Sequence, residues 1–171
     1  GLSIAIDANG FVYSTGLFQG TADFDPGAGT FNLTANSMDG FVVKLNALNG
    51  NLVWAKQFLT SFLVEPGAIA IDAYGNVITV GHYEGIADFD PGAGSLNFSG
   101  DGAYITKLDS AGNLIWAKQL AHPASQSPLS SCIAKSLVLD SLGNVYATGD
   151  FIDTVDFDPG LGNYNLIGDY Y

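Results

Sequence analysis

Hydrophobic and polar residues alternate in short runs along the chain, and glycine-bearing turns separate the runs. Ile4-Ala-Ile-Asp is followed by Ala-Asn-Gly and then by Phe11-Val-Tyr-Ser-Thr. Two runs of β-forming residues around Asn-Gly are typical of a β-hairpin. The same pattern recurs around 72–76 and 140–144, so we expect three such hairpins. The aspartates that precede these turns are expected to accept hydrogen bonds from the turn backbone; they are Asp7, Asp72 and Asp140.

A second hairpin is predicted to join the run 41–45 to the run 52–56 through a turn at 46–51. Its counterpart turns at 109–113. No segment shows sustained helical periodicity with caps. The fold class is therefore predicted to be all-β, with four main antiparallel strands in each unit.

One motif repeats along the chain. Asp-Phe-Asp-Pro-Gly-Ala-Gly occurs at 23–29 and 88–94, and Asp-Phe-Asp-Pro-Gly-Leu-Gly follows at 156–162. The first two copies are 65 residues apart and the next two are 68 apart, which indicates an array of one repeated unit. Four strands per unit favour β-propeller blades, although common blades span only about 40–50 residues. We attribute the excess to an inserted hairpin that carries Asp-Phe-Asp-Pro-Gly; a β-solenoid is the competing architecture.

The unit boundaries are predicted at 1–65, 66–133 and 134–171, and the last unit is truncated. We therefore expect the chain to be a segment of a longer propeller. The segment 122–136 is rich in Ser, Pro and Ala and is predicted to be an exposed loop between units.

The composition narrows the possible partners. Hydrophobic residues make up 47% of the chain, which favours a folded protein over a disordered one. No apolar run approaches the roughly 20 residues that span a bilayer, so no membrane insertion is expected. The 17 acidic residues face five lysines, and the net charge of −12 repels phosphate backbones. Nucleic acid is therefore not an expected partner.

The repeated aspartates are the candidate metal ligands. Asp23 and Asp25 are two positions apart, so on a strand both carboxylates point to one face. A cluster of oxygen ligands of this kind could hold calcium, with a third aspartate from the next strand. The three predicted sets are Asp23, Asp25, Asp39; Asp88, Asp90, Asp101; and Asp156, Asp158, Asp169. The alternative is a turn in which the aspartate accepts backbone hydrogen bonds while Pro and Gly set the dihedral angles.

Recurring aromatic residues are predicted to pack the units together. Trp54 and Trp116 occupy the same place in two units, which favours contact between blades over a sugar-binding shelf. Phe24, Phe89 and Phe157 lie inside the repeated motif and are predicted to plug the core.

Residues with catalytic chemistry are few. His82 and His122 do not recur and lie in no metal-ligand spacing, so both are expected at the surface. The single Cys132 is expected to be a small apolar residue near a loop. No nucleophile or phosphate-binding motif is present. Three equal copies of an acidic pair favour a structural motif over one glycosidase site, so we expect no enzymatic activity.

The strings Asp-Gly-Phe-Val-Val-Lys-Leu, Gly-Asn-Leu-Val-Trp-Ala-Lys and Ile-Ala-Ile-Asp-x-x-Gly-Asn-Val-Tyr-x-Thr-Gly run through the units. This pattern resembles the SBBP repeat, a β-propeller repeat, in the form common in large secreted proteins of Bacteroidetes. The resemblance implies an extracellular or cell-surface location, often reached by type IX secretion. It also implies an adhesive or structural role.

The expected function is thus a non-enzymatic extracellular scaffold in a large cell-surface adhesin or appendage, which mediates adhesion or assembly. Its expected partners are neighbouring repeats, other copies of the protein, and surface glycans or other cells. Two alternatives stay open. One is a carbohydrate-binding, lectin-like propeller, and the other is the accessory propeller of a secreted hydrolase. No cofactor is expected except calcium at the aspartate sets.

Overall fold

The computed structural model describes residues 1–121 and 131–168, and within them every regular element is a β-strand. No helix in these ranges is long and apolar enough to cross a membrane. The strands are β1 (Ser3–Ile6), β2 (Phe11–Phe18), β3 (Thr21–Asp23), β4 (Asn32–Thr34), β5 (Asp39–Asn46), β6 (Leu52–Thr60), β7 (Leu63–Ile71), β8 (Val77–Asp88), β9 (Asn97–Leu108), β10 (Leu114–Ala121), β11 (Ser131–Leu139), β12 (Val145–Asp156) and β13 (Asn165–Gly168). The prediction of an all-β fold is confirmed.

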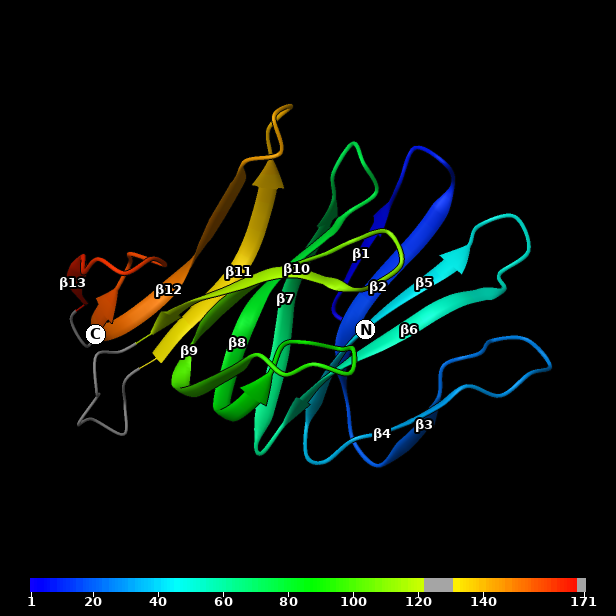
Figure 1. The fold of residues 1–171 in the computed structure, drawn as a ribbon, viewed down its shortest axis with the longest axis horizontal. Coiled ribbons are helices and arrows are strands. Elements are labelled where there is room, and N and C mark those ends of the chain that lie inside the picture. The colour runs from blue at the N-terminus through cyan, green and yellow to red at the C-terminus, as the bar shows by residue number, and fades with distance from the viewer. Residues whose placement is uncertain (122–130, 169–171) are drawn as a thin grey trace.

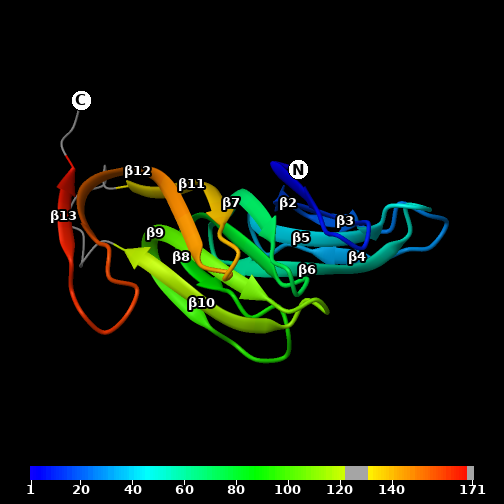
Figure 2. The same cartoon turned by 90° about the horizontal axis from the view of Figure 1, so that it is seen from above.

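The strands pair antiparallel in three successive meanders. The first meander is β1-β2-β5-β6, the second is β7-β8-β9-β10, and the third contains β11, β12 and β13. Short pairings join neighbouring meanders: the end of β6 pairs with β8 at Leu59 and Asp88, and the end of β10 pairs with β12 at Ala121 and Asp156. The result is one curled sheet (Figures 1 and 2).

Four of the five predicted hairpin turns share one local hydrogen-bonding pattern. The Asp7 carboxylate Oδ1 accepts the backbone N–H groups of Asn9 and Phe11, both at 2.9 Å. Gly10 adopts a φ of 79°, which a residue with a side chain rarely adopts. The same Oδ1 contacts occur at Asp72, Asp109 and Asp140. These turns depend on sequence-local contacts, which explains why the sequence pattern predicts them.

The repeated motif lies at the tip of an extended hairpin. In the second meander β8 and β9 pair without interruption from Val77 and Leu108 to Asp88 and Asn97, and the motif forms the connection between them. In the first meander the chain leaves β2 at Gly20, with a φ of 65°, and forms the separate two-stranded sheet β3-β4. The insertion is thus an extension of the hairpin made by the second and third strands of a meander.

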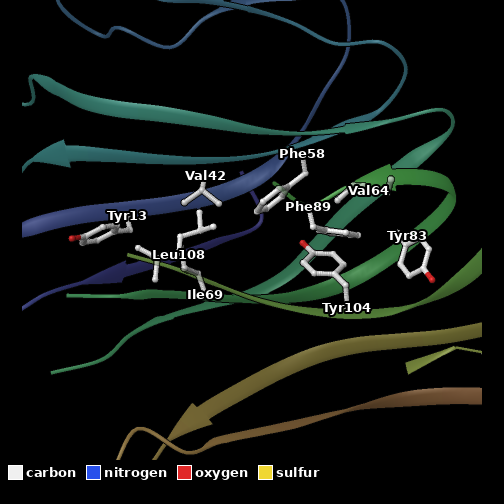
Figure 3. Close-up of a cluster of buried hydrophobic side chains, with 11 residues drawn as sticks. Tyr13, Val42, Phe58, Val64, Ile69, Tyr83, Phe89, Tyr104 and Leu108 are labelled. Carbon is white, nitrogen blue, oxygen red and sulfur yellow. The ribbon is translucent and has the colours of Figure 1, made fainter. Parts of the chain in front are cut away.

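The main core lies between meanders and not within one of them. Figure 3 shows Tyr13 and Val42 from the first meander beside Ile69 and Leu108 from the second. A second buried cluster joins Ile78 and Val80 of β8 to residues of β11 such as Leu137. A sheet buries an apolar face only against another layer, so each meander covers the face of its neighbour.

Two predictions, about residues 131–136 and about His82, need correction. Residues 131–136 were expected in an exposed loop, but they form the first part of β11, where Cys132 and Ala134 are buried. Residues 122–130, including His122, lie outside the described residues. His82 was expected at the surface, yet only 5% of it is exposed. It lies where β8 packs against β11, a contact that local sequence does not reveal.

Candidate functional site

Each Asp-Phe-Asp-Pro-Gly motif forms the same closed turn. In the first copy the Asp23 carboxylate Oδ1 accepts the N–H groups of Asp25, at 3.0 Å, and Phe31, at 2.8 Å. The Asp25 carboxylate then accepts the N–H of Gly27 at 2.8 Å. The second and third copies repeat these contacts at Asp88, Asp90, Asp156 and Asp158. The geometry is that of the turn alternative, in which the carboxylates satisfy backbone N–H groups.

The turn also explains the final glycine of the motif. A Cβ atom on Gly29 or Gly94 would lie 2.2 Å from the Oδ2 atom of Asp25 or Asp90, respectively. Real Cβ atoms do not approach an oxygen so closely, so a larger residue would displace the carboxylate. Glycine at this position therefore leaves room for the carboxylate that accepts the N–H of Gly27 or Gly92.

The first carboxylate of the motif is held in its charged form in two of the three copies. Hydrogen bonds from the N–H groups of Phe31 and Asp25 keep the pKa of the Asp23 carboxyl below its ordinary value. Those from Tyr164 and Asp158 do the same for the pKa of Asp156. An acid of this kind is a poor proton donor at neutral pH. Asp23 and Asp156 are therefore unsuited to general acid catalysis.

The third aspartate of each predicted set lies in a different environment. Asp39 is fully buried, and its carboxylate accepts the backbone N–H of Thr60 at 3.1 Å and the Gln57 side-chain amide at 2.6 Å. Asp101 lies on β9 directly opposite Glu84, and Asp169 is outside the described residues. In the described parts of the chain, one group of three His, Cys, Asp or Glu side chains has ligand atoms within 4.8 Å of one another, and it is His82, Glu84 and Asp101. Calcium binding at the aspartate pairs stays a prediction.

Phe89 and Trp54 lie at contacts between meanders, whereas Phe24 and Phe157 pack within their own. Phe89 is fully buried, and its ring centroid lies 5.5 Å from that of Phe58 on β6 of the first meander. Trp54, also on β6, donates its indole N–H to the carbonyl of Ser110 in the second meander at 3.1 Å. Phe24 and Phe157 are half-buried, against Phe41 and Phe151 respectively.

Two equivalent grooves lie where one meander meets the next, and we call them the junction grooves. Each is lined by an Ala-Lys-Gln run of a last strand, 55–57 or 117–119, and by the Asp-Pro-Gly of the following motif, 90–92 or 158–160. Their volumes are about 310 and 410 Å³, respectively. An aromatic ring completes each lining, Phe31 in the first groove and Phe98 in the second. Sequence reasoning missed these grooves because their two walls come from different units.

The junction grooves combine groups that suit recognition. Each offers a lysine, a glutamine amide, an aspartate and an aromatic ring. Small polar ligands are bound by a few such placed polar groups beside an apolar surface. Neither lining contains a serine, cysteine or histidine that could serve as a nucleophile with its base. The grooves are therefore candidate binding sites.

A comparison of the sequence with models of known protein families finds no match, and a search of curated proteins finds none either.

Proposed function

We propose that the chain is a non-enzymatic repeat scaffold of an extracellular adhesin or appendage, which associates through the faces of its meanders. One observation carries the proposal: equivalent side chains are buried inside the array and exposed at its two ends. Ile69 of the second meander is 7% exposed, whereas the equivalent Ile4 of the first is 67% exposed. At the other end Tyr146 is 56% exposed, whereas the equivalent Tyr13 is fully buried. The exposed side chains belong to the same kind of face that neighbouring meanders bury against each other.

The arrangement of the meanders supports a propeller. The first strands β1, β7 and β11 lie along a common side, with β7 in contact with β1 and β11 in contact with β7. Each meander then continues outward to its last strand, β6 or β10. Blades of a propeller are four-stranded antiparallel sheets placed around one axis. We therefore propose that the meanders are propeller blades and that the motif hairpins extend their second and third strands.

The proposed partners follow from the two end faces of the array. A continuous exposed apolar patch, unlike a single exposed apolar residue, marks an interaction site. Each end face corresponds to a face that neighbouring meanders bury against each other inside the array. Neighbouring repeats or other copies of the protein are thus the partners that fit. The extracellular location rests on the resemblance of the repeated strings to the SBBP repeat.

The proposal is tested by the self-association of the chain. Light scattering after size exclusion should show a mass that rises with protein concentration. Replacing Ile4 with aspartate should weaken this association, because a charge would enter the shared interface. Leu48→Asp is the matched control, since Leu48 is 95% exposed in the turn between β5 and β6. A stable monomer at every concentration, or equal effects of the two variants, would contradict the proposal.

A lectin-like function is the second candidate, favoured by the recurrence of the junction grooves. Glycan binding should then weaken in Lys118→Ala, which removes a groove lysine, and persist in Lys135→Ala, whose lysine is paired with Asp150 on β12. A glycan array on which the chain binds nothing would count against this candidate.

A further inference from the structure

His82, Glu84 and Asp101 form a compact cluster near the junction of the second and third meanders. His82 and Glu84 are two residues apart on β8, so their side chains lie on the same face of the strand. Asp101 is the direct cross-strand neighbour of Glu84 on β9. The His82 side chain is 7% exposed, whereas Glu84 and Asp101 are 38% and 33% exposed. The cluster is thus closed on the imidazole side and open to solvent at the carboxylates.

The hydrogen bonds of His82 define what its second nitrogen faces. Nδ1 lies 3.1 Å from the carbonyl oxygen of Cys132 on β11. A carbonyl oxygen only accepts, so Nδ1 carries the proton in this contact. In the neutral imidazole Nε2 is then an acceptor, and it lies 3.2 Å from the Oε1 atom of Glu84. Two acceptors at this distance require an electropositive species between them, either a proton on Nε2 or a metal cation.

The charges around His82 favour a cation with more than one charge. Glu84 and Asp101 are directly opposite each other on antiparallel strands, and like charges in such a pair are destabilising. The chain as a whole carries a net charge of −12, which attracts divalent cations. A divalent ion between Glu84 and Asp101 would offset this repulsion.

The distances also fit a metal. Zinc binds imidazole nitrogen at about 2.0–2.1 Å and carboxylate oxygen at about 2.0–2.2 Å, so two ligands at a tetrahedral angle are about 3.3 Å apart. The 3.2 Å between Nε2 and Oε1 matches this separation. Asp101 lies beside the ring: its Oδ1 atom is 3.9 Å from Nδ1, the nitrogen that faces Cys132, and one ligand atom from each of the three residues lies within 4.8 Å of the others.

We propose that His82, Glu84 and Asp101 bind a divalent transition metal, with zinc as the best match to one imidazole and two carboxylates. Imidazole is a ligand of zinc, whereas calcium takes oxygen ligands, so the histidine separates this site from the predicted calcium sets. The Cys132 carbonyl serves as the outer partner of the imidazole, in the way that metal-bound histidines donate their other N–H. Because Cys132 belongs to β11, the metal would fasten the third meander to the second.

The other repeats supply an internal comparison. Aligning the glycines that precede His82 and its counterparts places Leu17 in the first meander and Asp150 in the third at the His82 position. Neither residue can replace the imidazole as a nitrogen ligand. We therefore expect one zinc ion for each chain and not one for each repeat.

Isothermal titration with zinc chloride at pH 7.5, on the chelator-treated chain, tests the site. We expect one ion bound per chain and a higher melting temperature. His82→Gln should weaken zinc affinity by at least about tenfold, since loss of a group that only hydrogen-bonds to a metal ligand already costs about 10–100-fold in affinity. Glu84→Gln, at a partly exposed position, should do the same if His82→Gln fails to fold. Asp150→Asn, which removes an exposed charge on a neighbouring strand, should bind as the parent chain does.

Three results would overturn the proposal. The first is the absence of zinc binding by the folded parent chain, which would leave a protonated imidazole as the species between Nε2 and Glu84. The second is unchanged zinc binding in a folded His82→Gln or Glu84→Gln chain. The third is an equal loss of binding in Asp150→Asn, which would indicate an effect of overall charge.

Discussion

Phe89 provides the sharpest test of packing between meanders. Its side chain is fully buried, and its ring lies near four others, with centroid distances of 4.6 Å to Tyr104, 5.0 Å to Phe98, 5.5 Å to Phe58 and 5.8 Å to Tyr83. Phe58 belongs to the preceding meander, as Figure 3 shows. Removing a fully buried phenylalanine side chain costs about 3–5 kcal/mol. We expect Phe89→Ala to lower the free energy of unfolding by this amount.

The same residue in the first motif is the matched control. Phe24 is half-buried and packs against two rings, Phe18 at 5.1 Å and Phe41 at 5.0 Å, both from its own meander. Because burial scales with the area removed from water, Phe24→Ala should cost about half as much, roughly 1.5–2.5 kcal/mol.

Urea denaturation, followed by tryptophan fluorescence and by circular dichroism at low protein concentration, measures both variants. The comparison holds only if the denaturant slopes are equal, since a changed slope indicates a changed transition. An equal loss of stability in Phe24→Ala and Phe89→Ala would refute the argument that the contact between meanders stabilises the motif in the second unit.

Three further predictions concern single contacts. Burial by itself raises the pKa of Asp72, but the hydrogen bonds from Lys107 and the turn outweigh it and leave this pKa below its ordinary value. The contribution of Asp72 to stability is therefore present above its unfolded pKa of about 3.9 and is lost as pH falls through the lower folded value. Acid unfolding curves of the parent chain should show this loss of stability. The Asp72→Asn chain should not show it, because the amide does not titrate. Gly94→Ala should cost about 1–3 kcal/mol in urea denaturation, because the new Cβ would meet the Asp90 carboxylate, and an unchanged midpoint would contradict the steric explanation. Calcium added to the chelator-treated chain should raise the melting temperature if Asp88 and Asp90 bind it, whereas an unchanged melting temperature would count against calcium there.

Local sequence was sufficient to predict the strands and turns. The turn at Asp7 requires only that the Asp7 carboxylate accept the N–H groups of Asn9 and Phe11, two and four residues later, and that glycine occupy the position of positive φ. The motif turn is equally local, since Asp88 and Asp90 bond to residues within the same connection. Such contacts depend on neighbours in the chain, so the repeated strings predict repeated structure.

The tertiary structure alone decided which of these equivalent positions are buried. Ile4 and Ile69 lie in nearly the same sequence, yet Ile4 is exposed and Ile69 is buried, because the first meander covers Ile69 on β7. His82 is buried by β11, 50 residues away in sequence, and the junction grooves are closed by walls from two units. The sequence by itself determined the repeated strand-and-turn unit, since the contacts that form it are local. The packing of one unit on the next, and with it the junction grooves and the burial of His82, arises from contacts between distant residues that no single unit contains.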